Sequence, residues 1–208
     1  AFMGDFKLLM TNGIISLVEA LIGLSFGLVA AVILAVLMDK SKTLMQMITP
    51  LLLITQTIPT VALAPLLILW FGYGMLPKII LIFLTCFFPI TMGILGGFAK
   101  VDIDSVRLLQ SMGASQSQIY YHLKFPEALP SFFSSLKVST SYAFVGAVIA
   151  EWLGGDEGLG VYMTRVRKSY SYDKMFAAII LIVIISLLLM KIVELIEKRA
   201  MPWRREFK

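Results

Sequence analysis

Charge is the scarcest property of this 208-residue sequence. Only 15% of the residues are charged and 59% are hydrophobic, whereas a soluble domain of this size has a charged fraction of about 25%. The sequence also has a single cysteine, Cys86, and a single histidine, His122. One cysteine cannot close a disulfide within the chain, and with one histidine it cannot complete a usual zinc site. We therefore expect Cys86, which lies in an apolar run, to be a packing residue.

Motifs for catalysis and nucleotide binding are missing as well. No glycine is followed directly by a lysine, which excludes the G-x4-G-K-[ST] phosphate loop, and no H-E-x2-H metal motif occurs. No nucleic-acid motif accompanies the net charge of +5, and in a membrane protein such charge more often lies in cytoplasmic loops. We expect a chain that is not an enzyme, has no catalytic residues, binds no metal or cofactor itself and has no nucleic acid partner.

Long apolar runs are what the sequence has in abundance. A bilayer core needs about 20 apolar residues of helix, and five segments reach that length: about 14–38, 44–72, 77–99, 132–153 and 175–196. No linker composition divides the chain, so we predict one domain over residues 1–208. The fold class predicted is all-α: a polytopic protein of the cell membrane with five transmembrane helices surrounded by lipid. Ala1 is no initiator and residues 1–13 read as neither signal nor span, so we expect a further N-terminal span to precede them.

The second apolar segment, 44–72, is too long and too rich in proline to be one straight helix. Its prolines are Pro50, Pro59 and Pro65, and the polar residues Thr55, Gln56 and Thr57 lie between them. Proline frees backbone carbonyls, which is tolerated at membrane depth where the backbone lines a cavity or is buried in protein. Broken helices also form the binding sites of transporters. We predict a translocation path near 55–71, with a kinked packing helix as the alternative.

Two aromatic residues at the end of this segment have two interpretations. Trp70 and Phe71 can line the predicted path, or they can belong to an aromatic belt at the outer membrane interface.

Lysine and arginine are distributed unequally between the loops. Loops 39–43, 100–131 and 197–208 together hold ten: Lys40, Lys42, Lys100, Arg107, Lys124, Lys198, Arg199, Arg204, Arg205 and Lys208. The opposite side holds six: Lys7, Lys78, Arg165, Arg167, Lys168 and Lys174. The side with the excess is predicted to be cytoplasmic, which places the C-terminus in the cytoplasm.

The longest of these predicted cytoplasmic loops, 100–131, contains a punctuated polar stretch. Gly113 can end a helix with a positive φ, and Ser115 and Gln118 have the S-x-x-Q spacing of a capping box. Pro126 disfavours helical geometry at Phe125, so we expect a short helix over 115–125 that stops there. An amphipathic helix lying on the lipid surface is the alternative.

The stretch RLLQSMGASQSQIYYHLKFPEALP resembles the coupling loop of ABC-importer permeases, whose signature is EAA-x3-G-x9-I-x-LP. Gly113 matches the glycine, Leu123 stands at the isoleucine position, and Phe125-Pro126 stands at the LP. Arg107, Leu108 and Leu109 stand where the family has EAA, which is a departure from the signature.

Three further segments are similar to the nitrate/sulfonate/taurine-type permeases, a group that includes thiamine-precursor-type members. They are TIPTVALAPLLILWFGYG (57–74), FFPI (87–90) and AEWLGGDEGLG (150–160). Glu19, in SLVEALIG, departs from the arginine usual in that context.

The resemblance implies a type I ABC-importer permease core and a set of partners. A cytoplasmic coupling helix would dock on a separate ATPase subunit, which binds ATP and Mg, through Gly113, Ala114, Ser115, Leu123 and Pro126. A second permease copy, giving a homodimer, would complete the pore, and an extracellular substrate-binding protein would deliver a small nutrient.

The same resemblance implies an outer gate and a range of substrates. The gate would include Glu151, Gly158 and Gly160, although Glu151 can equally be a solvated residue at the interface. Substrates of the group are sulfonates, taurine, nitrate, pyrimidine thiamine precursors and riboflavin-like compounds, and the aromatic-rich path favours a ring-containing nutrient.

Two alternatives from other classes remain open. An ionisable group deep in the membrane would favour an ATP-independent secondary transporter or channel subunit, and Glu19, near the outer end of its span, is the only candidate. A membrane scaffold without transport is the other, and the proline-broken segment argues against it.

Overall fold

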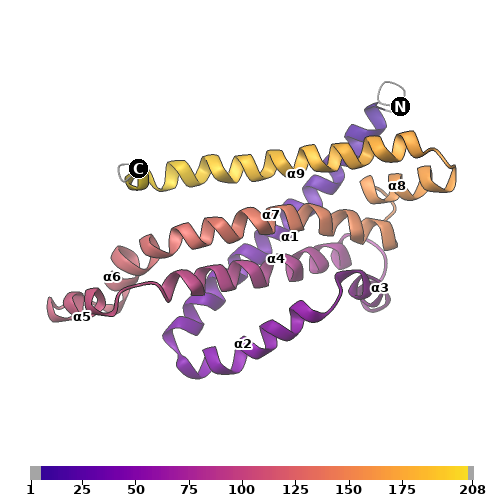
Figure 1. The fold of residues 1–208 in the computed structure, drawn as a ribbon. Coiled ribbons are helices and arrows are strands. Elements are labelled where there is room, and N and C mark those ends of the chain that lie inside the picture. The colour runs from indigo at the N-terminus through magenta and orange to yellow at the C-terminus, as the bar shows by residue number, and fades with distance from the viewer. Residues whose placement is uncertain (1–5, 206–208) are drawn as a thin grey trace.

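The computed structural model describes residues 6–205, with the side chains of residues 6–203. Its helices, shown in Figure 1, are α1 (Phe6–Lys40), α2 (Lys42–Thr57), α3 (Thr60–Phe71), α4 (Met75–Phe98), α5 (Ile103–Ser111), α6 (Gln116–Ile119), the π-helical turn η1 (Tyr120–Lys124), α7 (Phe125–Gly154), α8 (Leu159–Lys168), α9 (Tyr172–Ala200) and the 3-10 turn η2 (Pro202–Arg205). No strand occurs among the described residues. The predicted all-α class is confirmed.

Four helical stretches are long and apolar enough to cross a membrane without a break. They are α1, α4, the continuous stretch Gln116–Gly154, and α9. The pair α2 and α3 counts as a fifth span only if its two halves are taken together, because they meet at a bend of 98°. The segment expected to be too long for one straight helix is therefore divided in two.

The first span extends well beyond the predicted 14–38. Helix α1 has 35 residues, a length of about 52 Å at 1.5 Å per residue, against a hydrocarbon core of about 30 Å. Residues 6–13, expected to lie outside any span, continue the helix because they pack on the bundle: Leu9 is fully buried. Residues 1–5, the rest of that stretch, lie outside the described residues.

Helix α4 is the centre of the bundle and touches α1 on one side and α7 on the other. A Cβ atom built on Gly23 of α1 would lie 2.6 Å from Cβ of Ile82, and one on Gly97 of α4 would lie 2.6 Å from Cα of Ala128. Helices in a bilayer associate through such close packing, because lipid provides little hydrophobic drive between them. The buried Cys86 belongs to this core, as predicted.

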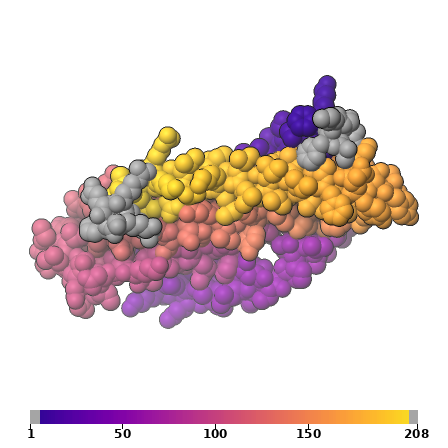
Figure 2. Space-filling model, turned by 45° about the horizontal axis from the view of Figure 1, so that its top comes forward, coloured from indigo at the N-terminus to yellow at the C-terminus, as the bar shows by residue number. Residues whose placement is uncertain are grey.

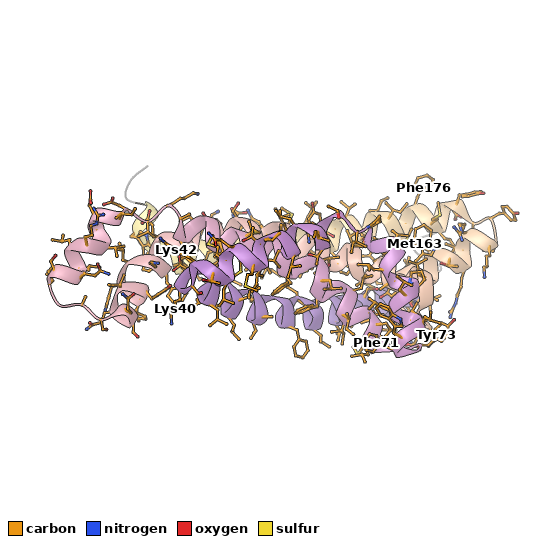
Figure 3. All side chains as sticks on the ribbon, turned by 90° about the horizontal axis from the view of Figure 1, so that it is seen from below. Lys40, Lys42, Phe71, Tyr73, Met163 and Phe176 are labelled. Atoms are coloured by element: carbon orange, nitrogen blue, oxygen red, sulfur yellow. The ribbon has the colours of Figure 1, made fainter. Side chains whose placement is uncertain are left out.

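The two ends of the bundle carry different elements. The described end of the C-terminal helix lies beside α5 and α6, whereas the start of α1, the helix α3 and the helix α8 gather at the opposite end (Figure 1). Figure 3 shows Lys40 and Lys42 at the first end and Phe71, Tyr73, Met163 and Phe176 at the second. We name these the coupling end and the α8 end. The three loops with the excess of basic residues therefore share the coupling end. Lys208, one of the ten basic residues counted in them, lies outside the described residues.

The broken pair α2–α3 is the least tightly packed part of the bundle. Only Leu52 is buried in α2, and only Ala64 and Leu67 in α3. Pro59 caps α3 with an extended backbone, φ −61° and ψ 124°, so the chain leaves the helical path at this proline. In the space-filling view a gap separates part of the purple segment from the body of the bundle (Figure 2).

Candidate functional site

At the coupling end, both ends of helix α5 are capped. The Asp102 carboxylate accepts hydrogen bonds from the Ser105 hydroxyl and from the backbone N–H groups of Asp104 and Ser105, which hold the pKa of this carboxyl below its usual value. At the other end Gly113 has φ +82°. Its N–H donates to the Gln110 carbonyl at 2.9 Å, and the Ala114 N–H donates to the Leu109 carbonyl at 3.0 Å. This is a Schellman motif, and it produces the turn expected at Gly113.

A capping box starts the next helix, as the S-x-x-Q spacing predicts. The Ser115 N–H donates to Oε1 of Gln118 at 2.8 Å, and the Gln118 N–H donates to Oγ of Ser115 at 3.4 Å. The glycine turn and the capping box together fix the direction in which α6 leaves α5.

The predicted stop at Pro126 is wrong. Phe125 is helical, with φ −65° and ψ −50°, and the chain continues from η1 into the 30 residues of α7. The reason is the π-helical turn over Tyr120–Lys124, in which the Phe125 N–H bonds to the Tyr120 carbonyl five residues back. Pro126 then falls in the first turn of α7, where a missing N–H costs little, and the wider turn makes room for its ring.

Asp39, at the end of α1, holds this segment against the bundle. Nζ of Lys124 lies 2.5 Å from Oδ2 of Asp39, and the Tyr120 hydroxyl donates to the same oxygen. Tyr120 is buried, with its ring edge-on to Phe98 of α4 at 5.9 Å between centroids. The sequence pattern did not predict these contacts, because Asp39 lies more than 80 residues from both partners.

The outward side of the same segment is open. Met112 and Tyr121 are about three-quarters exposed, at 73% and 74%. A hollow of about 510 Å³ is lined by Tyr121, His122, Phe125, Pro126 and Leu129. Of the predicted docking residues, Gly113 and Ser115 are exposed, and Ala114, Leu123 and Pro126 are half-buried. Together they form one continuous segment at the tip of the coupling end.

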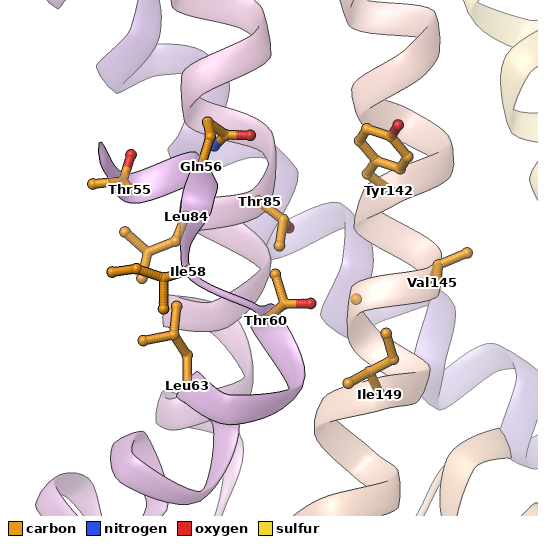
Figure 4. A pocket seen from close by; sticks show the side chains of 11 residues that line it. Thr55, Gln56, Ile58, Thr60, Leu63, Leu84, Thr85, Tyr142, Val145 and Ile149 are labelled. Atoms are coloured by element: carbon orange, nitrogen blue, oxygen red, sulfur yellow. The ribbon is translucent and has the colours of Figure 1, made fainter. Parts of the chain in front are cut away.

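A cavity of about 390 Å³ lies between the α2–α3 break and the middle of α4 and α7 (Figure 4). Its wall consists of Thr55, Gln56, Ile58, Thr60, Leu63, Leu84, Thr85, Tyr142, Val145, Gly146 and Ile149. The hydroxyls of Thr55 and Thr85 donate to the carbonyls of Leu52 and Ile82 within their own helices. The polar groups of Gln56, Thr60 and Tyr142 make no hydrogen bond to any described residue, so they are available to a solute.

The predicted path residues separate into two groups. Thr55 and Gln56 line the cavity, and Thr57 and Pro59 form the break beside it. Trp70 and Phe71 are not part of the wall, because the bend directs α3 to the α8 end, where they are 69% and 48% exposed. Their position is compatible with the interfacial belt that is the alternative interpretation.

A buried polar cluster joins the helices at the α8 end. Nζ of Lys78 lies 2.7 Å from Oε1 of Glu19, and both side chains are almost completely buried. Glu151 is only 1% exposed, so the interpretation of this residue as solvated is wrong. Its Oε2 accepts the Gly160 N–H at 2.8 Å. Lys78, counted from sequence among the basic residues on the non-cytoplasmic side, is thus the buried partner of Glu19.

Three successive backbone N–H groups at the start of α8 each bond to a side chain of another helix. Gly158 donates to Oδ1 of Asn12 at 2.9 Å, Leu159 donates to Oγ of Ser16 at 2.9 Å, and Gly160 donates to Glu151. The first N–H groups of a helix have no partner within it, and the positive end of the helix dipole favours a carboxylate there. Helix α8 is therefore fastened to α1 and α7.

The predicted gate residues lie in direct contact with one another. Gly158 has φ +112°, and a Cβ atom on it would overlap the Glu151 carboxylate. A Cβ atom on Gly160 would lie 2.9 Å from Cβ of Glu151 and closer still to the Val148 carbonyl oxygen. Only glycine fits at these two positions while Glu151 is buried beneath them.

No group of three or more histidine, cysteine, aspartate or glutamate side chains suited to a metal ion occurs within the described part of the chain. An all-α bundle with a broken span beside a largely apolar cavity that holds a few polar groups, and with an exposed capped segment at one end, is the architecture of a membrane transport subunit. The chain belongs to the family of binding-protein-dependent transport system inner membrane components, whose profile matches residues 23–202.

Named relatives and solved structures agree with this family. The chain is 35% identical over 185 residues to the formylaminopyrimidine transport permease protein ThiX of Halalkalibacterium halodurans, covering 89% of this chain and 74% of ThiX. It is 29% identical over 191 residues to the taurine transport system permease protein TauC of Escherichia coli, covering 92% and 70%. A chain of the MetNI methionine ABC transporter, in an inward facing conformation, superposes with a TM-score of 0.82 at 18% identity, over 93% of this chain and 96% of that chain.

The resemblance found in the sequence is thereby confirmed. The protein is a multi-pass permease subunit of an ABC importer, and its fold is the type I permease fold. Importers of this kind work with an ATPase and a binding protein.

Proposed function

We propose that this chain forms half of a homodimeric pore and that the segment Gly113–Pro126 docks on the ATPase. The chain itself is not an enzyme and binds no cofactor, because ATP and Mg belong to the ATPase. The observation that carries the proposal is the continuity of the helix that leaves this segment. Movement at the exposed tip passes through η1 into α7 without an intervening loop.

Helix α7 connects the three sites in one element. Pro126 and Leu129 near its start line the hollow at the coupling end. Tyr142, Val145, Gly146 and Ile149 form one wall of the cavity, and Glu151 in its last turn holds the start of α8. A displacement of the first turn therefore reaches the cavity and the outer contacts together, as alternating access requires.

The α8 end is the side on which we place the extracellular binding protein. Nη2 of Arg165 donates to the Asp156 carbonyl at 3.1 Å, and Arg167 lies over the Trp152 ring at 5.5 Å from its centroid. Arg165, Arg167 and Lys168 thus present a basic helix face at this end, which suits a partner with acidic residues. Glu151, Gly158 and Gly160 beneath that face would act as the outer gate.

The distribution of basic loops supports a cytoplasmic coupling end, with the C-terminus in the cytoplasm and the bundle in contact with lipid. An ATP-independent transporter has less support, because Glu19, its candidate ionisable group, is neutralised by Lys78 at 2.7 Å.

Substitution at Gly113 tests the proposal. A side chain at Gly113 has open space around it, but it is strained by the φ of +82°. Gly113→Glu is expected to stay in the membrane, to release the ATPase during purification and to abolish uptake. Gly96→Ala is the matched control, because its site is equally open and its backbone is helical. Normal ATPase recovery and uptake with Gly113→Glu would contradict the docking assignment.

A further inference from the structure

The cavity at the α2–α3 break contains no charged side chain. Its polar groups are hydroxyls and one amide, and the rest of its wall is aliphatic. In Figure 4 the side chains of Gln56, Thr60 and Thr85 extend from their helices toward α7, which contributes Tyr142 from the other side. Hydrogen-bonding groups therefore occur on both sides of an otherwise apolar space.

The absence of charge extends beyond the wall itself. Residues 43–77, 79–99 and 138–150, which supply α3, nearly all of α2 and α4, and the part of α7 beside the cavity, include no Asp, Glu, Lys, Arg or His. A second copy that presents these same segments to the cavity would add no charge either. A pore built from this chain thus offers a solute only neutral groups at the depth of the cavity.

Of the cations that border these segments, Lys42 and Lys100 do not line the cavity, and the other two have acidic partners. Lys78 pairs with Glu19 at 2.7 Å, and Lys137 of α7 pairs with Glu197 of α9. Glu151, the remaining buried ionisable residue next to these segments, is a carboxylic acid and supplies no cation. A solute with an anionic group, such as nitrate, a sulfonate or zwitterionic taurine, would find no cation in the cavity wall to compensate the lost hydration of that group, which costs several kcal/mol or more.

The size of the cavity also favours an organic molecule. About 390 Å³ equals the liquid volume of roughly 13 water molecules at ~30 Å³ each. That space suits a ring with one or two substituents and is large for an ion such as nitrate. Aliphatic side chains such as Ile58, Leu63 and Ile149 can cover the faces of a ring, while the hydroxyls and the amide bond its edge.

We propose that this permease carries an uncharged, ring-containing solute with hydrogen-bonding groups on its edge, and not a sulfonate, taurine or nitrate. The proposal rests on the proposed function, because it takes this cavity as part of the path. The proposed substrate class differs from the substrate in the name of the taurine permease TauC and agrees with the substrate in the name of the formylaminopyrimidine permease ThiX. The determinants assigned are the neutral groups of Gln56, Thr60 and Tyr142.

Equilibrium dialysis tests this inference without the selectivity of the binding protein. The complex of this permease with its ATPase would be dialysed against radiolabelled formylaminopyrimidine, radiolabelled taurine and nitrate in turn. We expect the pyrimidine to be retained and the two others not. Retention of taurine or nitrate instead, or of none of the three, would overturn the proposal.

Removal of single hydroxyls locates the binding. Tyr142→Phe and Thr60→Val are each expected to weaken retention of the pyrimidine about 3- to 10-fold, as the loss of one hydrogen bond implies. Tyr172→Phe is the control for the first, because Tyr172 is exposed to the same extent, 52% against 53%. Equal retention by all variants would place the solute elsewhere and refute the assignment.

The ATPase provides the readout that separates the two proposals. If it co-purifies and hydrolyses ATP while taurine is the retained solute, the substrate class is wrong and the proposed function stands. If it never associates with the permease, the proposed function fails, and dialysis of the permease alone still decides the substrate class.

Discussion

Asp39 and Lys124, 85 residues apart in the sequence, form a 2.5 Å ion pair that fastens the coupling segment to the end of α1. The Tyr120 hydroxyl shares the same carboxylate oxygen. The side chains of the pair are only 17% and 19% exposed, so water screens the pair less than it screens a surface salt bridge. A force applied to the exposed tip therefore acts on α1 as well as on α7.

Asp39→Asn is expected to uncouple ATP hydrolysis from uptake. The amide keeps the size of the side chain but loses the charge that holds Lys124 and the Tyr120 hydroxyl. Loss of a charge-assisted hydrogen bond costs about 1.5–3 kcal/mol, so we expect a lower thermal midpoint, reduced uptake and persistent ATPase association. Asp104→Asn, at the exposed pair with Arg107, is the control and should leave all three unchanged. An Asp39→Asn protein with full uptake would show that this tie has no coupling role.

Gly158→Ala is expected to destabilise the α8 end. At φ +112° a Cβ atom is strained, and it would also overlap the Glu151 carboxylate. Backbone strain of this kind costs about 1–3 kcal/mol. Gly72→Ala has a φ of +77° and nothing within contact distance, so it carries the strain without the overlap. A larger fall in thermal midpoint for Gly158→Ala than for Gly72→Ala measures the contact with Glu151, and equal falls would argue against it.

Gln56→Leu is expected to reduce uptake about 3- to 10-fold while ATPase association and basal ATP hydrolysis persist. The change keeps the approximate size of the side chain and removes the amide that faces the cavity. Gln46→Leu makes the same change on the exposed surface of the same helix and serves as the control. If Gln56→Leu transports normally, or if it fails to assemble, Gln56 is a packing residue.

Cysteine labelling tests the orientation. A cysteine at exposed Ser117 should resist an impermeant thiol reagent in intact cells, and one at exposed Ser169 should react. The native Cys86 is fully buried and provides the unreactive background. Labelling at Ser117 from outside would reverse the orientation and remove the docking role of the coupling segment.

Several features follow from the sequence because they depend on local chemistry. The apolar runs determine the membrane class and the all-α fold, since a bilayer-spanning backbone must satisfy its own hydrogen bonds. The Gly113 turn and the Ser115–Gln118 capping box form as expected because donors and acceptors lie within a few residues of each other. The break near Pro59 is also local, because proline has no N–H to donate.

The tertiary structure decides the features that depend on distant partners. Continuation of the helix past Pro126 requires the π turn, which forms where Tyr120 is held by Phe98 and Asp39. The burial of Glu19 depends on Lys78, 59 residues away, and Gly158 bonds to Asn12 across 146 residues. Which residues face the cavity depends on the 98° bend, which directs Trp70 and Phe71 away from it. Each of these outcomes depends on residues that are distant in the sequence, and only the packed bundle brings them within reach of one another.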